Sequence, residues 1–266
     1  MANLDSINNI VRVMDFHALA RIDKARSSAE KAKETEILLE NSIRQICYNK
    51  NLNIDKKLLT SNMSGVDLNI YIGSDLSFCG DFNSSILGEL ENDSNDKKII
   101  VGQKVYSVYG KETLLSISKE DFYIDSSQIS KIINDYLVDN KVRKISIIYN
   151  KYYSIDDIRL EREQIFPVEL EMQKDDNYDV DFVIENDANK VLCGIISAYL
   201  NFKVIIAERN SWAAENVSRE RIARESLKRI KELRLIEKSR RNKIRRSREL
   251  AKQIENFKML HWRKSL

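Results

Sequence analysis

The chain has 266 residues, of which 42% are hydrophobic and 32% charged, and its formal net charge is +3. This composition excludes a disordered chain, and the length suits one large domain or two modest ones. No run of 18 apolar residues occurs, and the first residues lack a basic and then apolar stretch, so we expect neither a membrane span nor a secretory signal. Three widely spaced cysteines and two histidines argue against disulfides and zinc, and favour a reducing, cytoplasmic compartment.

The residues that interrupt helices are confined to the middle of the chain. The single proline, Pro167, and all seven glycines lie between Gly65 and Gly194. Because glycine and proline are the residues that most often break helices, this pattern predicts a globular middle between two helical flanks. The predicted domains are an N-terminal helix, an inserted domain and a C-terminal helix, over residues 1–60, 61–205 and 206–266.

Apolar residues in both flanks recur at steps of three and four, which places them on one stripe of a helix. The N-terminal stripe comprises Ile7, Ile10, Met14, Ala18, Leu19, Ile22, Ala25, Ala29 and Ala32. The looser C-terminal stripe comprises Val217, Ile222, Ile230, Leu233, Ile236, Ile244, Ala251, Ile254, Phe257 and Leu260. A helix of about 55 residues is roughly 80 Å long, too long for a small domain to bury, so we expect the two helices to pack as a coiled coil. The alternative is that each flank breaks into two ordinary helices.

The middle of the chain alternates short β-rich runs with helical patterns, which predicts a small α/β domain. Strands are expected over residues 68–72, 98–101, 105–109, 145–149 and 180–184. Amphipathic helices are expected over residues 125–138 and 188–200, and a polar surface turn over 92–97.

The sequence offers little catalytic machinery. It contains no Gly-Lys-Ser/Thr phosphate loop, and its glycines are too sparse for a dinucleotide fingerprint. Ser74-Asp75 has no neighbouring base, and His17 and His261 are interpreted as solvated helix residues. Four acids could hold a metal, although a solvated acidic loop is the preferred interpretation: Asp175, Asp176, Asp179 and Asp181. We therefore expect no catalytic residue, no cofactor and no metal site.

Positive charge is concentrated in the last quarter of the chain. From Glu208 to Leu266 there are 19 basic and 8 acidic residues, a net +11, whereas the remainder carries −8. The densest part, Lys238–Arg248, has seven basic residues among eleven and no acid. Such a run could bind nucleic-acid phosphates, face acidic protein loops or form a solvated helix surface.

One segment after the first predicted strand resembles a known family. Residues 74–83 read Ser-Asp-Leu-Ser-Phe-Cys-Gly-Asp-Phe-Asn. They resemble the Ser-Asp-Arg-Gly-Leu-Cys-Gly-Gly-Leu-Asn segment of rotary ATP synthase gamma subunits. The identical positions are Ser74, Asp75, Cys79, Gly80 and Asn83, and the positions that differ in character are Leu76, Ser77 and Asp81. We interpret Cys79 as a small buried residue and not as a reactive thiol.

Both flanks resemble the same family. In the first helix, six residues fall in the register of the family's Ile-Thr-x-Ala-Met-x-x-Val-Ala-x-x-Lys-Leu-x-x-Ala pattern: Ile10, Met14, Ala18, Arg21, Ile22 and Ala25. In the last helix, three short matches resemble the family's Leu-x-Leu, Arg-Gln and Glu-Leu landmarks: Leu233-Arg234-Leu235, Arg241-Asn242 and Glu249-Leu250. The resemblance covers the whole chain in the correct order, and the chain resembles a divergent member of the rotary, F-type ATP synthase gamma-subunit family.

The resemblance implies an α/β fold in which an antiparallel coiled coil of long N- and C-terminal helices carries an inserted Rossmann-like α/β domain. It implies a central rotor shaft of a membrane-associated rotary ATP synthase, which transmits torque between the ion-driven c-ring and the catalytic alpha/beta hexamer and has no active site of its own. The implied partners are the alpha, beta and epsilon subunits and the c-ring. The implied location is the cytoplasmic face of a bacterial inner membrane, and nucleic acid is not an expected partner.

The resemblance also implies which residues contact partners. Arg241 and Asn242 occupy the family's Arg-Gln position, where the shaft meets loops of the catalytic subunits, and Arg245 is a neighbour whose guanidinium could pair with carboxylates. Met14 either packs within the coiled coil or contacts the surrounding ring. Two alternative functions are the shaft of a related, specialised rotary ATPase and a basic coiled-coil protein that binds nucleic acid.

Overall fold

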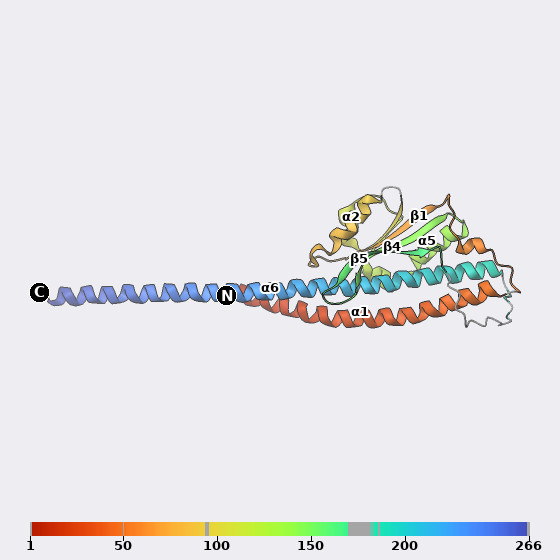
Figure 1. Cartoon of the computed structure of the whole chain (residues 1–266). Helices are drawn as coiled ribbons and strands as arrows, with labels where there is room; N and C mark the ends of the chain where they lie inside the picture. The colour runs from red at the N-terminus through yellow and green to blue at the C-terminus, as the bar shows by residue number, and fades with distance from the viewer. Residues whose placement is uncertain are drawn as a thin grey trace. The chain divides into compact units, whose positions relative to one another are not determined.

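The computed structural model describes residues 2–49, 51–93, 96–169, 182, 184, 185 and 187–264. These residues form two compact units, one of residues 17–220 and one of residues 1–16 together with 221–266. Two long helices, α1 (Ala2–Tyr48) and α6 (Ala188–Lys264), contribute to both units (Figure 1).

Each flank contains one long unbroken helix, of 47 residues in α1 and 77 residues in α6, although α1 ends at Tyr48 and not at residue 60 as predicted. The prediction of long terminal helices is therefore confirmed, and the alternative of two helices in each flank is wrong. The helix expected over residues 188–200 is the first part of α6, so the predicted boundary between residues 205 and 206 falls inside this helix. Gly194 does not end it, because one glycine costs a helix only about 1 kcal/mol and the neighbouring turns are packed in the core.

The unit of residues 17–220 is built on a five-stranded sheet in the order β3-β2-β1-β4-β5. The first four strands are parallel, and β5 runs antiparallel to β4. Their bounds are β1 Val66–Ile72, β2 Lys97–Val101, β3 Leu115–Ile117, β4 Val142–Tyr152 and β5 Ile158–Phe166. The strands predicted over residues 68–72, 98–101 and 145–149 are confirmed as parts of β1, β2 and β4.

Other predictions in this unit differ from the structure. The strand predicted over residues 105–109 is wrong, because these residues lie in the helix α3 (Gln103–Tyr109). Gly102, with φ at 126°, ends β2 and turns the chain into that helix. The strands β3 and β5 were not predicted, since β3 has only three residues and β5 is an edge strand rich in charged side chains.

Some predictions concern residues that the structure does not describe. All four acids of the proposed acidic loop lie outside the described residues, as does the strand predicted over 180–184 apart from Phe182 and Ile184. The turn predicted over 92–97 includes two such residues, 94 and 95.

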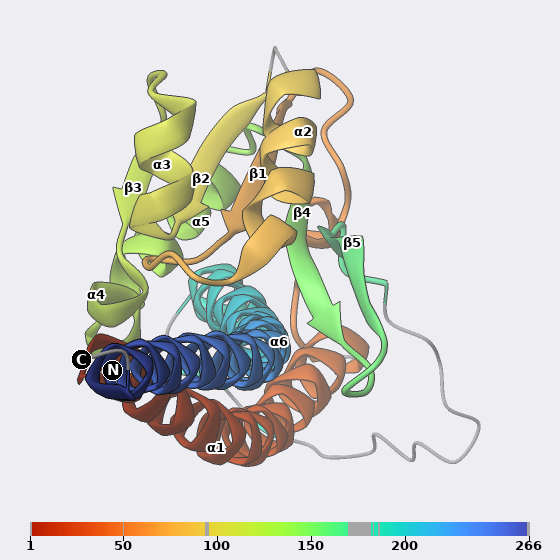
Figure 2. The same cartoon turned by 90° about the vertical axis from the view of Figure 1, so that its left-hand side faces the viewer.

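Helices cover both faces of the sheet (Figure 2). The helices α2 (Ser84–Asn92) and α3 lie on one face, and α5 (Ser127–Val138), α6 and the end of α1 lie on the other. Because alternate residues of a strand face opposite sides, β1 sends Ile70 into one core and Tyr71 into the other. The helix predicted over residues 125–138 is confirmed as α5. The remaining helical elements are the short helix α4 (Lys119–Ile124) and the single turns Lys56–Leu59 and Gly80–Asn83.

The two long helices run antiparallel. In the unit of residues 17–220, Nζ of Lys203 on α6 lies 2.6 Å from Oε1 of Glu36 on α1. In the other unit, Nη2 of Arg234 lies 2.5 Å from Oδ1 of Asp5. Later residues of α6 thus pair with earlier residues of α1, as an antiparallel arrangement requires. Small buried residues of α1 allow close approach of the helix backbones: Ala18, Ala25 and Ala32.

One stretch of α6 is long and apolar enough, by length and composition alone, to cross a membrane; it is the one such stretch among the described residues. Half of that window is buried inside the protein, where Leu192, Ile196 and Leu200 of α6 belong to the core of the α/β domain. A core helix meets the same criterion, so the composition does not by itself indicate a span.

Gly73, directly after β1, tests how tightly the sheet packs on α3. A Cβ at Gly73 would lie 2.1 Å from Cγ2 of Val105, which is buried and short. We expect Gly73→Ala to lower the free energy of unfolding by about 1–3 kcal/mol through overpacking. Gly88→Ala, in α2 and with no atom within 4 Å of the added Cβ, should raise it by about 0.5–1 kcal/mol. Urea unfolding followed by circular dichroism measures both, and equal midpoints for the two variants would contradict this packing.

Candidate partner-contact segment and its support

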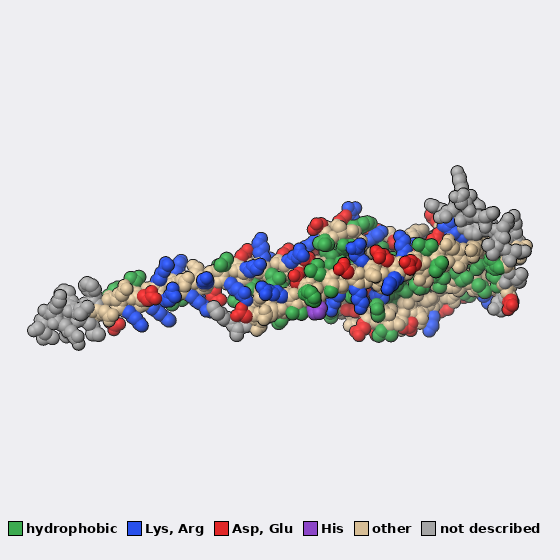
Figure 3. Space-filling model, turned by 90° about the horizontal axis from the view of Figure 1, so that it is seen from below, with side chains coloured by type: hydrophobic (Ala, Val, Ile, Leu, Met, Phe, Trp, Pro, Cys, Tyr) green, Lys and Arg blue, Asp and Glu red, His purple; other side chains and the backbone are tan. Residues whose placement is uncertain are grey.

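The C-terminal part of α6 has no covering element among the described residues. Every described side chain from Lys238 to Asn256 is exposed, and we call residues 238–256 the exposed segment. It carries eight Lys or Arg and two Glu residues, and Figure 3 shows the basic side chains along it. The predicted apolar stripe is therefore not buried here, and its exposed members include Ile244 and Ile254. The reason is length, since Arg234 already pairs with Asp5, close to the start of α1.

Three of the four predicted contact residues lie together on the exposed segment. Nη2 of Arg241 lies 2.6 Å from Oε1 of Glu237, and Nε of Arg245 lies 3.8 Å from Oε1 of Glu249. Such exposed pairs one helical turn apart contribute only about 0.3–0.5 kcal/mol, so a carboxylate of a partner could compete for either guanidinium. Asn242 is exposed beside them.

The fourth predicted contact residue, Met14, lies on α1 and is half-buried. That intermediate burial fits neither a fully packed core residue nor a free surface one. His17 is exposed on the same helix, and the side chain of His261 is outside the described part of the chain.

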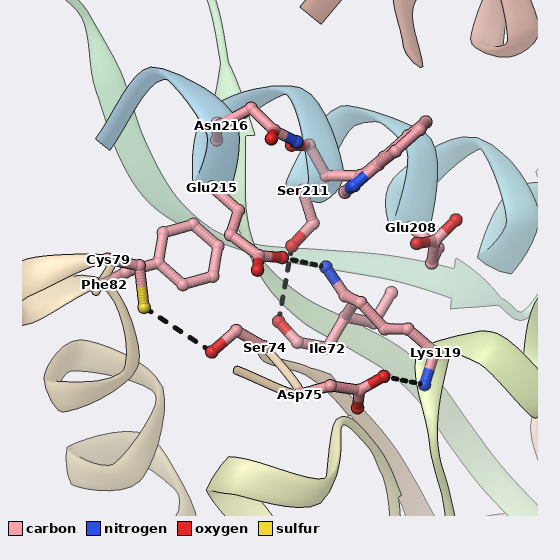
Figure 4. Close-up of polar contacts among 12 residues, drawn as sticks. Ile72, Ser74, Asp75, Cys79, Phe82, Lys119, Glu208, Ser211, Glu215 and Asn216 are labelled. Carbon is pink, nitrogen blue, oxygen red and sulfur yellow. Dashed lines mark hydrogen bonds and ion pairs between the residues drawn. The ribbon is translucent and has the colours of Figure 1, made fainter. Parts of the chain in front are cut away.

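The segment that resembles the gamma-subunit motif, residues 74–83, forms a loop held together by its own polar groups (Figure 4). The N–H of Ser74 donates to Oδ1 of Asn83 at 3.1 Å, and Nδ2 of Asn83 donates to Oγ of Ser74 at 2.8 Å. Sγ of Cys79 lies 3.5 Å from the same hydroxyl and is buried. Ser74 and Cys79 therefore shape the loop, as expected for Cys79, and neither is placed as a nucleophile.

Asp75 ties the ends of three adjacent strands together. It follows β1, its Oδ1 accepts the N–H of Gln103 after β2 at 2.8 Å, and its Oδ2 accepts the N–H of Lys119 after β3 at 2.9 Å. A carboxylate that accepts two backbone donors makes charge-assisted hydrogen bonds, which are stronger than neutral ones. The motif is thus a brace at the carboxyl edge of the sheet.

The same edge is covered by α6. In doubly wound sheets, ligands bind outside the carboxyl ends of the strands, where the strand order reverses. Here the order reverses between β1 and β4, and the fully buried Ser211 of α6 lies at that position. Its hydroxyl donates to the carbonyl of Ile72, the last residue of β1, at 3.5 Å (Figure 4). A helix of the protein itself therefore packs against the end of β1, next to the position at which ligands bind in other folds of this kind.

Buried charges line the contact between α6 and the sheet edge. Nζ of Lys119 lies 2.7 Å from Oε2 of Glu215, and Nη2 of Arg219 lies 2.6 Å from Oε1 of the same carboxylate. About two turns earlier on α6, Oε2 of Glu208 lies 2.9 Å from Nη1 of Arg209 but accepts no hydrogen bond from any described residue.

Sequence reasoning missed these charges. Glu208, Ser211 and Glu215 recur at steps of three and four, which places them on one face of α6. Ala207 and Ala214, both buried, lie close to that face in sequence. This polar stripe, next to small apolar residues on a helix that was expected to pack, could have predicted that buried charges lie on α6. It does not identify Lys119 as their partner.

Burial raises the pKa of Glu208, although Lys119 and Arg209 oppose the shift, and Glu215 and Asp75 add to it. The unfolded carboxyl ionises near pH 4.5 and the folded one only at higher pH, so the free energy of unfolding falls as the pH rises through that interval. We expect Glu208→Gln to remove this loss and to be more stable than the wild type at pH 8 but not at pH 4. Each pH unit by which the pKa is raised corresponds to about 1.4 kcal/mol.

Thermal or urea unfolding at the two pH values measures this effect. Glu91→Gln, at the exposed end of α2, is the matched control and should show no pH-dependent gain. A Glu208→Gln variant that is less stable than the wild type at pH 8 would contradict the prediction.

Comparison with known proteins agrees with this architecture. Residues 1–248 match the family model described as ATP synthase. The ATP synthase gamma chain of Clostridium perfringens is 24% identical over 232 residues, which cover 82% of this chain and 79% of the relative. The ATP synthase gamma chain of Malacoplasma penetrans is 25% identical over 257 residues, which cover 88% of this chain and 90% of the relative.

Two solved structures share the fold. One is the central stalk and c-ring structure of the Tetrahymena thermophila mitochondrial ATP synthase, whose matched chain has a TM-score of 0.57 and 17% identity, with 82% of this chain and 99% of that chain covered. The other is a Euglena gracilis mitochondrial ATP synthase, with a TM-score of 0.54, 15% identity and 97% of both chains covered. With the family model matching nearly the whole sequence, the chain belongs to the ATP synthase gamma-subunit family, whose members are non-catalytic stalk subunits.

Proposed function

We propose that this chain works as the central shaft of a membrane-associated rotary ATP synthase and transmits torque between an ion-driven c-ring and a catalytic alpha/beta hexamer. The observation that carries the proposal is the single helix α6 of 77 residues, which contributes both to the α/β unit and to the exposed segment. A continuous helix can carry rotation along its axis without a joint, whereas a glycine- or proline-containing break would let the two parts turn separately.

The two parts of the chain suit different partners. The α/β domain would contact the epsilon subunit and the c-ring, and the exposed segment would lie inside the alpha/beta hexamer. The relatives are named as ATP synthase gamma chains, and the Tetrahymena structure contains the central stalk with its c-ring, which supports these partners. Translocation of protons or sodium ions would be a property of the membrane ring. The complex would place this chain peripherally, on the cytoplasmic face of a bacterial inner membrane.

The exposed segment would act through differential contact. Arg241 and Arg245 can each exchange a weak intrahelical ion pair for a bidentate bond to a carboxylate of a catalytic subunit. At any one angle the shaft would contact the catalytic subunits differently, and so favour a different conformation in each of them. Rotation of the shaft would then change which subunit adopts which conformation. Asn242 and Met14 would add uncharged contacts to the surrounding subunits.

Affinity purification of the tagged chain from its own cells in mild detergent tests the proposal. Co-purification of alpha and beta subunits with c-ring components is the expected result. Recovery of nucleic acid, with binding that weakens steeply as salt is raised, would replace the proposal by the nucleic-acid alternative for the basic run. Catalytic subunits without c-ring components would indicate the shaft of a related, specialised ATPase instead.

Arg241→Ala tests the contact assignment. The side chain is half-exposed and on the surface, so we expect the free energy of unfolding to change by less than about 0.5 kcal/mol. In the assembled complex, ion pumping per ATP hydrolysed should fall about two- to tenfold, as expected for one lost contact of about 0.5–1.5 kcal/mol. Arg229→Ala, an exposed arginine of α6 before the exposed segment, is the matched control and should pump normally. Normal coupling in Arg241→Ala would remove this assignment.

A further inference from the structure

We infer that the buried ion pair between Lys119 and Glu215 is the contact that fixes α6 in register against the α/β domain and passes torque between them. This inference rests on the proposed rotary function and goes further, because it identifies positioning residues inside the shaft itself. We call Lys119, Glu215 and Arg219 the ionic lock (Figure 4 shows its Lys119 and Glu215).

The ionic lock joins elements that are far apart in the sequence. Lys119 is the first residue of α4, shortly after β3, and Glu215 lies in the first half of α6. Their side chains are only 10% and 3% exposed, so the pair is shielded from competing water and salt. Nη2 of Arg219, one turn further along α6, lies 2.6 Å from the second carboxylate oxygen and adds a second positive charge beside Glu215.

The backbone of Lys119 is itself anchored to the sheet. Its N–H donates to Oδ2 of Asp75, and the other oxygen of Asp75 accepts the N–H of Gln103. Force applied to α6 at Glu215 therefore reaches the ends of β1, β2 and β3 through two consecutive polar contacts. The motif loop and the ionic lock form one connected network (Figure 4).

A second contact between α4 and α6 makes the attachment resist rotation. Tyr123 lies one turn after Lys119 on α4, and the centroid of its ring is 4.2 Å from the guanidinium carbon of Arg209. Arg209 and Glu215 are six residues apart on α6, which separates them by about 9 Å along the helix axis. Two contact points at different positions along α6 oppose both sliding and turning, whereas one point opposes sliding alone.

The apolar part of this contact restrains α6 in a different way. Its nearby buried residues include the small Ala207, Ala213 and Ala214 between the larger Val204 and Val217. Apolar contact is also non-directional, whereas a buried ion pair is lost entirely when the partners move apart, leaving an uncompensated charge. Buried polar groups are known to fix helix register for this reason.

The test compares Lys119→Met with Lys119→Arg, which keeps the charge, and with Lys203→Met as matched control. Lys203 makes an ion pair of similar length with Glu36, but it joins α6 to α1 and not to the α/β domain. In the full chain, hydrogen exchange of backbone amides over residues 208–219 reports whether α6 is held. In the complex assembled with alpha, beta and c-ring subunits, ion pumping per ATP hydrolysed reports torque transfer.

We expect Lys119→Met to speed exchange over residues 208–219 by at least about tenfold and to lower pumping per ATP at least about threefold while hydrolysis continues. Lys119→Arg should keep both the exchange rate and the pumping close to those of the wild type. Lys203→Met should leave pumping unchanged. Normal pumping in Lys119→Met, or equal losses in Lys119→Met and Lys203→Met, would overturn the inference. Failure of the wild-type chain to assemble with the other subunits would refute the proposed function itself, and the exchange result would then separately decide whether the ionic lock holds α6.

Discussion

The structure depends on one constraint, which is that a single helix must be packed along one part of its length and exposed along another. The first part of α6 buries Leu192, Ile196 and Leu200 in the core of the α/β domain. The exposed segment buries nothing within the described residues and carries a strong positive charge. No single periodic pattern satisfies both environments. Among the described residues, the last buried apolar residue of α6 is Ile230, and large apolar residues after it, such as Leu233 and Ile254, are exposed. The change in pattern along α6 follows the change in its surroundings.

Much of the fold was predictable because it depends on residues with strong local preferences. The placement of every glycine and the single proline between Gly65 and Gly194 predicted two long helices around a globular middle, and the alternating β-rich and helical runs predicted that this middle is an α/β domain. The local preferences of the residues did not predict the structure where contacts with distant parts of the chain decide it. Val105–Tyr109 has the composition of a strand but becomes α3, because Gly102 ends β2 and the chain must cross back over the sheet. The three residues of β3 are too few for any periodic signal.

The sequence predicted the candidate contact residues of the exposed segment, but not the buried charges between α6 and the sheet edge. Arg241, Asn242 and Arg245 were found from a resemblance and a dense basic run, and the structure places them together on the exposed segment. Their contacts with a partner form only in the complex. Lys119 and Glu215 could not be paired from the sequence, because 96 residues separate them and a lone lysine after a short strand has no distinguishing pattern. Their partnership is created by the sheet order, which brings the end of β3 beneath α6.

The motif around Ser74–Asn83 gains its physical meaning from this arrangement. Ser74 and Asn83 close the loop on itself, which leaves the carboxylate of Asp75 free to accept the backbone donors that follow β2 and β3. In a nucleotide-binding fold, these strand ends would surround a phosphate group, and backbone donors would bind the ligand. Here one carboxylate takes those donors and α6 takes the space, so the edge that supports catalysis in other α/β domains supports a helix. At this edge the protein holds its own helix, through Ile72 at the end of β1 and Lys119 after β3, by the same kind of directional polar contacts that would otherwise orient a ligand.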